Sequence, residues 1–105
     1  MDKLIGLLGI AVRAGQAVFG EDSCMKALRG GQCEILLLDA AISGTVREKY
    51  AGVCERGGIP YTVLPEGTIA TATGHSGMAV VIRKGSLGSR IRELDLTGED
   101  PESTT

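Results

Sequence analysis

The sequence predicts an α/β fold, a three-layer α/β/α sandwich in which helices cover both faces of a four-stranded mixed sheet. Helical and strand patterns alternate along the chain, as this fold class requires. The runs 33–39 and 77–83 are mostly apolar, which is typical of strands covered on both faces. Glycine occurs 16 times in 105 residues, well above the average of about 7%, and glycines follow most of the helical patterns.

Length and composition predict one domain, residues 1–96, followed by an acidic tail, residues 97–105. A chain of 105 residues fits one compact domain of typical size. Aromatic residues make up only 3%, so the core must be built from aliphatic side chains. The last nine residues contain three acids and no base, a composition typical of disorder.

The first elements follow from apolar spacing and from glycine positions. A helix is expected at 3–14, where apolar residues recur at helical spacing, and Gly15 suits the position after its end. A short strand at 16–19 then leads into a second helix at 20–29. The run 33–39 predicts a central strand.

The second half of the chain repeats this alternation. Ser and Pro mark several element starts, because a serine side chain caps helices and proline is tolerated at the beginning of a strand. The expected elements are a helix at 44–56 capped by Ser43, a strand at 59–64, a short helix at 65–73 ended by Gly74, a strand at 77–83, and a helix at 86–94 capped by Ser86.

The charge balance does not by itself indicate a nucleic-acid partner. The net charge is −2, but three of the 13 acidic residues lie in the tail, and the other ten are matched by 11 basic residues. The folded part therefore lacks the strongly basic composition of an obvious nucleic-acid binder. Nucleic-acid binding through a local basic patch is still possible. Seven of the basic residues are arginines, which suit bidentate phosphate or guanine contacts, although solvated surface charge explains most of them more simply.

We expect no metal or other cofactor and no membrane partner. Cys24, Cys33 and Cys54 match no zinc-binding spacing, and no histidine lies near them. An odd number of cysteines without secretory features suggests a cytoplasmic protein with reduced thiols, packed as small hydrophobic side chains. No apolar run is long enough to cross a membrane.

Catalysis is poorly supported, and we expect a protein that is not an enzyme. His75 is the only histidine, and no Ser-His-Asp set or Walker-type loop can be proposed from the sequence. Asp39 ends a buried strand, where α/β proteins often place functional acids. Helix capping explains Asp39 equally well, so both interpretations stay open.

The transition at Gly20 is the strongest candidate for a binding site. A strand that breaks at a glycine and continues as a helix exposes unpaired N–H groups at the positive end of the helix dipole. Lys26 lies on the same helix and can neutralise a phosphate. Glu21 and Asp22 either favour the helix start electrostatically or accept hydrogen bonds from the edge of an unstacked guanine.

Several short motifs in a fixed order carry a resemblance that covers residues 4–94. They are Gly15 with Gly20, Lys26-Ala27-Leu28, the apolar strand ending at Asp39, Gly58-Ile59-Pro60, and Ile69-Ala70-Thr71-Ala72-Thr73-Gly74 before an apolar strand. In this order the chain resembles the L-seven-Ae/L-thirty-e ribosomal protein family, and is most similar to its small stand-alone bacterial members, the YlxQ-like proteins.

The resemblance implies an α/β/α protein that binds structured RNA, namely kink-turns or similar internal loops with sheared G·A pairs, in a ribosomal or ribosome-associated role. Its RNA surface would be the strand-to-helix junction and the loop before the last strand, with ribosomal proteins as candidate further partners. Carried over by position, the RNA-binding residues would be Gly20, Glu21, Asp22, Ser23, Lys26, Gly74, His75, Ser76, Gly77 and Met78. We add Arg29 and Arg83 as flanking phosphate contacts.

Four positions depart from the family pattern. Phe19 stands where strong binders have a lysine, Asp22 replaces an asparagine, Ser23 replaces a glutamate that reads a base, and Ala70 replaces a glycine. A lost lysine and an added carboxylate weaken phosphate attraction. Two alternatives therefore remain: a protein-interaction module on the same fold, and a small-molecule or nucleotide-binding domain that holds a phosphate at the Gly20 helix start.

Overall fold

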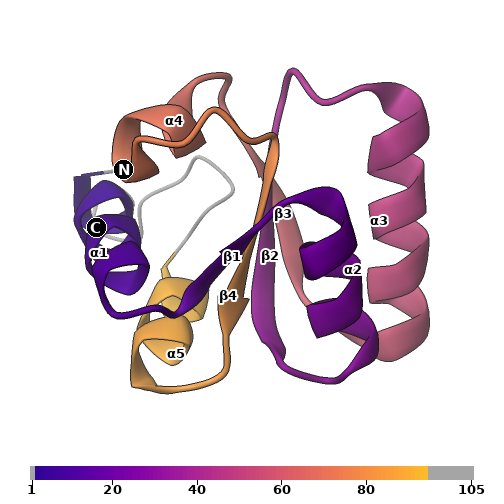
Figure 1. The fold of residues 1–105 in the computed structure, drawn as a ribbon, viewed down its shortest axis with the longest axis horizontal. Helices are drawn as coiled ribbons and strands as arrows, with labels where there is room; N and C mark the ends of the chain where they lie inside the picture. Colours follow the sequence, from indigo (N-terminus) through magenta and orange to yellow (C-terminus); the bar gives the residue numbers. More distant parts are fainter. Residues whose placement is uncertain (1, 95–105) are drawn as a thin grey trace, which may run out of the picture.

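The structure, a computed structural model, describes residues 2–94, which form five helices and four strands (Figure 1). Their order follows the predicted alternation. The elements are α1 (Asp2–Arg13), β1 (Ala17–Phe19), α2 (Glu21–Arg29), β2 (Cys33–Asp39), α3 (Gly44–Gly57), β3 (Tyr61–Leu64), α4 (Thr68–Thr73), β4 (Ala79–Arg83) and α5 (Ser86–Glu93).

The four strands form one mixed sheet in the order β1-β4-β2-β3. The central strand β4 pairs antiparallel with both β1 and β2, whereas β2 pairs parallel with β3. The predicted α/β class and the four-stranded mixed sheet are therefore confirmed. β2 and β4 are the two inner strands, which explains why their sequences are apolar.

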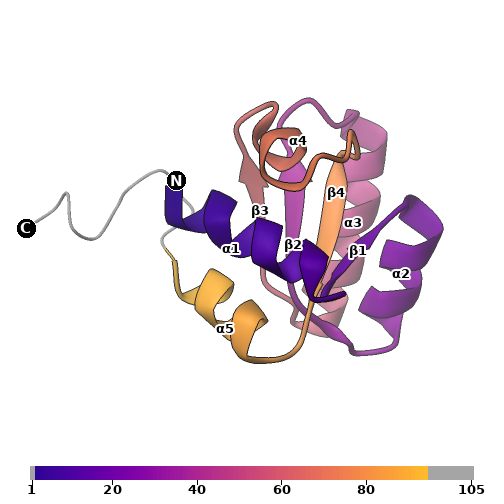
Figure 2. The same cartoon turned by 60° about the vertical axis from the view of Figure 1, so that its left-hand side comes forward.

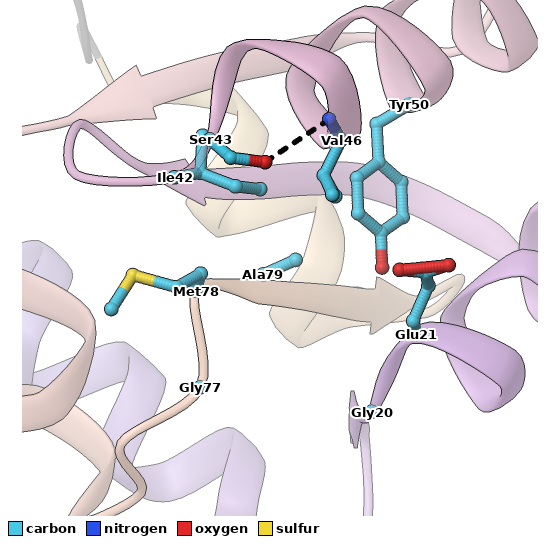
Figure 3. Close-up of a pocket in the computed structure, with 9 residues that line it drawn as sticks. All are labelled: Gly20, Glu21, Ile42, Ser43, Val46, Tyr50, Gly77, Met78 and Ala79. Atoms are coloured by element: carbon cyan, nitrogen blue, oxygen red, sulfur yellow. Dashed lines mark hydrogen bonds between the residues drawn. The ribbon is translucent and has the colours of Figure 1, made fainter.

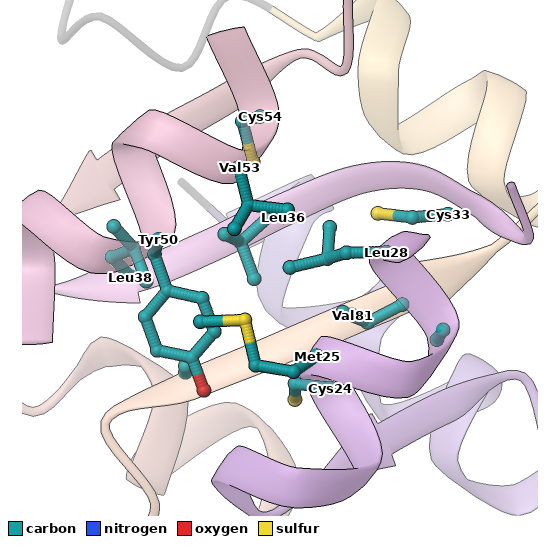
Figure 4. Packing of buried hydrophobic residues seen from close by; sticks show 12 residues of the cluster. Cys24, Met25, Leu28, Cys33, Leu36, Leu38, Tyr50, Val53, Cys54 and Val81 are labelled. Atoms are coloured by element: carbon teal, nitrogen blue, oxygen red, sulfur yellow. The ribbon is translucent and has the colours of Figure 1, made fainter. Parts of the chain in front are cut away.

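Helices cover both faces of this sheet and enclose two apolar clusters. The helices α2 and α3 lie on one face, and α1, α4 and α5 lie on the other (Figures 1 and 2). Alternate residues of β2 supply the two clusters, since Leu36 and Leu38 face α2 and α3 while Ile35 and Leu37 face the other helices. Figure 4 shows the cluster that lies between the sheet and the helices α2 and α3.

The strand directions give the sheet two ends with different loops. β1, β2 and β3 finish, and β4 begins, at one end, which we call the Gly20 end. At the other end, which we call the Arg29 end, β4 finishes at Arg83 beside the start of β2 at Cys33. α3 runs 14 residues from the first end to the second, a length of about 21 Å.

Several predicted element boundaries are wrong by a few residues. The short helix begins at Thr68 and not at residue 65, because Pro65 starts a turn and Gly67, with φ 87°, occupies the N-cap position. The last helix is preceded by Gly85, so Ser86 is its first residue and not its cap. The strands expected at 59–64 and 77–83 begin at Tyr61 and Ala79.

Other expectations concern the thiols, the membrane and the tail. Cys24, Cys33 and Cys54 are free and buried, as predicted. None of the helices in the described part of the chain is both long and apolar enough to span a bilayer. The predicted domain end at residue 96 and the acidic tail 97–105 lie outside the described residues.

Candidate nucleic-acid interface

Gly20 turns the chain from β1 into α2 in a backbone conformation that suits only glycine. Its φ is 89° and its ψ is 139°, and a side chain in this region is strained whatever the surrounding space. It occupies the N-cap position of α2, but it has no side chain to cap the helix. The sequence therefore builds an open helix start at this end of the sheet.

The first turn of α2 leaves backbone donors unused. The N–H of Cys24 donates to the Gly20 carbonyl at 2.8 Å, but within the described residues the N–H groups of Glu21, Asp22 and Ser23 have no acceptor. All three residues are exposed. A bound acceptor atom, such as a phosphate oxygen or a base edge, would satisfy these donors and meet the positive end of the helix dipole.

The loop 74–78 lies directly beside this junction. The His75 ring stacks on Phe19, the last residue of β1, with ring centroids 4.1 Å apart and planes inclined by 15°. At the end of the loop, the Met78 carbonyl accepts a hydrogen bond from the Asp39 N–H at 2.8 Å. Gly74, with φ 76°, ends α4 and starts the loop, as predicted. The two segments proposed from sequence are therefore neighbours.

A pocket of about 330 Å³ opens between these two segments and α3 (Figure 3). Its walls are mainly apolar, and Tyr50 points from α3 toward Glu21 at the start of α2. Its lining residues are Gly20, Glu21, Ile42, Ser43, Val46, Tyr50, Gly77, Met78 and Ala79. Pockets of about this size, with apolar walls and a few polar groups, are typical small-ligand sites.

The back of the pocket holds a neutral phenol. Tyr50 is only 2% exposed, and burial raises the pKa of its hydroxyl, which the nearby Glu21 carboxylate raises further. The adjacent Cys24 thiol donates to the Val18 carbonyl at 3.2 Å, and burial raises its pKa also. Both groups therefore stay protonated near neutral pH and give the pocket no charge.

The mouth of the pocket carries the negative charge of Glu21, which a lysine partly neutralises. Lys49 of α3 forms an ion pair with Glu21, with 2.9 Å between Nζ and Oε2, and both side chains are about half exposed. This pair links the starts of α2 and α3. An exposed ion pair contributes little to stability, and its main effect here is to reduce the negative charge that an incoming phosphate would meet.

We name as the Gly20 surface residues 20–23, residues 74–78 and the pocket side chains Ile42, Val46 and Tyr50. The structure brings together the predicted residues of the junction and the loop. Lys26 is exposed farther along α2 and does not line the pocket. Arg29 and Arg83 are not part of this surface, because both lie at the Arg29 end of the sheet.

The third segment of this surface, between β2 and α3, was not predicted from sequence. Ile42 and Ser43 precede α3, and Val46 and Tyr50 lie on it. The sequence signal was weak: one apolar residue in a short loop and one aromatic residue in a mostly polar helix. Ser43 itself is the predicted N-cap, and its Oγ accepts from the Val46 N–H at 3.3 Å.

Asp39 holds two loops together at this end of the sheet. It is 3% exposed, and its two carboxylate oxygens accept hydrogen bonds from the N–H groups of Ala41 at 2.7 Å and Gly67 at 3.0 Å. It therefore caps a turn and not a helix, and its acceptors are used within the fold. Within residues 2–94, no group of three or more His, Cys, Asp or Glu side chains is arranged to hold a metal ion.

Solved structures with the same architecture include a protein of unknown function from Bacillus halodurans and a 15.5-kD RNA-binding protein from Giardia lamblia. The Bacillus protein has a TM-score of 0.81 and 24% identity, over 88% of this chain and 95% of that chain. The Giardia protein has a TM-score of 0.72 and 18% identity, over 87% of this chain and 80% of that chain. This chain shares their fold. No protein-family model matches the sequence, and no curated protein sequence matches it either.

Proposed function

We propose that this protein binds structured RNA at the Gly20 surface without catalysing a reaction on it. The RNA would contain an internal loop of the kink-turn type, and the protein would act on or near the ribosome. One observation carries the proposal: an open helix start and an apolar pocket lie side by side, so unpaired backbone donors and a base-sized hollow face the same ligand.

Unstacked bases offer the chemistry that such a surface fits. In an RNA internal loop, bases leave the helical stack and expose their faces and hydrogen-bonding edges to a protein. A splayed base would pack against Ile42, Val46 and Met78 in the pocket. The N–H groups of residues 21–23 would donate to a phosphate or a base edge, and Asp22 would accept from a guanine edge.

Two likenesses, one of sequence and one of fold, support this proposal. The motif order of the sequence resembles a family of kink-turn-binding proteins, and the fold is shared with a protein described as RNA-binding. A shared fold does not determine function by itself. The geometry of the Gly20 surface gives further support to RNA binding. The two segments named from the resemblance are neighbours, and a pocket lies between them.

The test compares two RNAs by gel shift across a salt series. One RNA contains a kink-turn, and in the other, Watson–Crick pairs replace the sheared G·A pairs. We expect tighter binding of the kink-turn RNA, with an affinity that falls as salt rises. Lys26→Ala should weaken this complex several-fold, whereas Lys3→Ala, the same change on α1 across the sheet, should not. Absence of a complex with either RNA at low salt would overturn the proposal.

A protein partner at the same surface is the second candidate. Met78 is 44% exposed, which is unusual for a large apolar side chain, and the carboxylates of Glu21 and Asp22 lie nearby on an exposed helix start. An adaptable methionine beside acidic groups would suit a basic protein surface. Capture of a ribosomal protein that persists after nuclease treatment, together with a failed RNA gel shift, would favour this candidate.

A further inference from the structure

A second hollow lies at the Arg29 end of the sheet, away from the Gly20 surface. It has a volume of about 350 Å³ and is lined by three basic side chains from three different segments: Arg29 at the end of α2, Lys84 after β4, and Arg92 on α5. Its remaining walls are apolar or glycine, apart from Glu34 on β2. The fold therefore gathers cations here from positions far apart in the sequence.

Two of the cations at this end are held in place by neighbours. Arg92 pairs with Glu34 at 2.9 Å, and the Glu34 side chain is only 14% exposed. Arg83, next to Lys84, donates from Nη1 to the Gln32 side chain at 2.8 Å. The one carboxylate of the hollow is thus already paired, while within the described residues Arg29 and Lys84 have no side-chain hydrogen bond or ion pair.

Helix dipoles account for only two of the four cations at this end. Arg29 and Arg92 lie in the last turns of α2 and α5, where a positive charge complements the helix dipole. Arg83 and Lys84, however, lie at the end of β4 and just before Gly85, the N-cap of α5, where the helix dipole does not favour a positive charge. We name Arg29, Arg83, Lys84 and Arg92 the Arg29 surface.

The two ends of the molecule differ in charge. Toward the Gly20 end lie Glu21 and Asp22 in the first turn of α2 and Glu48 in the second turn of α3, against Arg47 and Lys49 of α3. Around the hollow at the Arg29 end, four cations lie near one paired carboxylate, and the last turn of α3 adds one acid and one base, Glu55 and Arg56. Phosphate attraction is therefore strongest at the Arg29 end, away from the mainly apolar pocket of the Gly20 surface.

We propose that the Arg29 surface binds the phosphate backbone of an RNA stem, independently of its sequence. Guanidinium groups make bidentate contacts with phosphate oxygens, and lysine adds a point charge. The surface lies at the opposite end of the sheet from the Gly20 surface, and Arg29 is about 13 Å along α2 from Gly20, so it contacts a different part of the RNA, or a second RNA. The choice of RNA over an acidic protein segment rests on the proposed function.

The test measures binding of a fluorescent RNA hairpin that contains only Watson–Crick pairs in its stem. Anisotropy titrations from about 50 mM to about 200 mM salt give the slope of log affinity against log salt. Arg29→Gln and Lys84→Gln should each reduce this slope by about one, and the double variant by about two. Arg92 is left unchanged, because its removal would leave Glu34 without its partner.

The matched control is Arg47→Gln, which removes one exposed positive charge at the other end of α3 and should leave the hairpin slope unchanged. Val46→Asp, which alters the pocket of the Gly20 surface, should weaken kink-turn binding far more than hairpin binding. Kink-turn binding without any hairpin binding would overturn the Arg29 proposal and leave the proposed function standing. Hairpin binding without any preference for the kink-turn RNA would overturn the proposed function and leave the Arg29 proposal standing.

An acidic peptide separates RNA from a protein partner at this surface. The probe is a labelled ten-residue polyglutamate, titrated against the same variants. If the double variant loses polyglutamate binding but keeps the wild-type hairpin affinity and salt slope, the Arg29 surface serves an acidic protein segment and the RNA proposal is wrong.

Discussion

Gly20 is the residue on which the Gly20 surface most depends, because it sets the angle between β1 and α2. Its positive φ is accessible to glycine without cost, and the space around its Cα is open. Gly20 is therefore needed for its backbone conformation and not for lack of space. A substitution at this position tests the backbone conformation without disturbing side-chain packing.

Gly20→Ala should lower the free energy of unfolding by about 1–3 kcal/mol, because alanine is strained at this backbone geometry. Gly6 provides a matched control: it lies in α1, also has open space around it, and does not have a positive φ. Gly6→Ala should raise stability by about 0.5–1 kcal/mol, since alanine favours helix. Urea unfolding measures both values, and equal effects of the two variants would contradict this interpretation of Gly20.

Phe19 shows how one residue differs from the family pattern and what the structure does with it. The resemblance places a lysine here in strong RNA binders. In this chain the Phe19 ring is covered by His75, so the side chain joins the loop 74–78 to the end of β1. A stacking contact between two rings thus occupies the position where the resemblance would place a lysine.

At the scale of elements, the connection from β2 into α3 completes the pocket. β2 lies beside β4, and the Asp39–Met78 hydrogen bond brings the start of α3 next to the loop 74–78. Val46, in the first turn of α3, lines the pocket, whereas its neighbour Thr45 is exposed and does not. The same acidic substitution at Val46 and at Thr45 can therefore separate the effect of the pocket on RNA binding from the effect of added negative charge.

Val46→Asp should weaken the kink-turn complex at least about tenfold more than Thr45→Asp does. Both variants add one negative charge at nearly the same distance from the RNA, so their long-range repulsion is similar. Only Val46→Asp places a carboxylate within the apolar pocket, where a packed base would desolvate it. Fluorescence anisotropy with labelled kink-turn RNA gives the ratio, and similar affinities for the two variants would exclude the pocket from the interface.

The element types followed from the sequence better than their ends did. β2 and the start of α3 were predicted correctly because local residues determine them, an apolar run and the Ser43 cap. The start of α4 and the cap of α5 were not, because Gly67 and Gly85 occupy N-cap positions without offering a capping side chain. Side-chain preferences identify helix starts only where a side chain forms the cap.

The sequence predicted only part of the candidate site, because the rest of the site depends on contacts between segments far apart in the chain. The junction at Gly20 and the loop 74–78 each have a local signature and a match in the resemblance. The pocket wall from Ile42 to Tyr50 depends on strand order, which no local pattern specifies. Arg29 was grouped with the site as a flanking phosphate contact, but α2 carries it about 13 Å from the Gly20 end.

At the scale of the whole molecule, three buried thiols link stability to pH. Burial raises the pKa of Cys33 from 9.0 to about 12 and that of Cys54 to about 11, and it raises the pKa of Cys24 as well. In the unfolded chain these thiols ionise near their ordinary pKa. Above pH 9 the unfolded state therefore binds fewer protons than the folded state, and stability falls as pH rises.

Stability should change little through these thiols below pH 8 and should fall between about pH 9 and about pH 12, the folded-state pKa of Cys33. Each thiol contributes a slope of at most about 1.4 kcal/mol per pH unit. Cys54→Ala removes one such group, so its curve should fall less steeply than that of the unmutated protein. Urea unfolding in reducing buffer at several pH values measures the slopes, and parallel curves for the two proteins would argue against a buried, protonated Cys54.

The whole molecule also presents two surfaces of different character at opposite ends of one sheet. The Gly20 surface offers backbone donors and an apolar pocket, while the Arg29 surface offers cations. Base contacts specify an RNA site, and phosphate contacts add affinity without specificity. A division of these two roles between the two ends explains how a chain with a net charge of −2 could still bind RNA.

The most direct test of the central claim is a map of backbone amide shifts by NMR as unlabelled kink-turn RNA is added to isotope-labelled protein. We predict that the largest shifts fall on residues 20–23, on residues 74–78 and at Ile42 and Val46, since these groups form the Gly20 surface. Smaller shifts at Arg29 and Lys84 should appear only with RNAs that have a long stem. Shifts confined to other parts of the protein, or no shifts at low salt, would contradict the account.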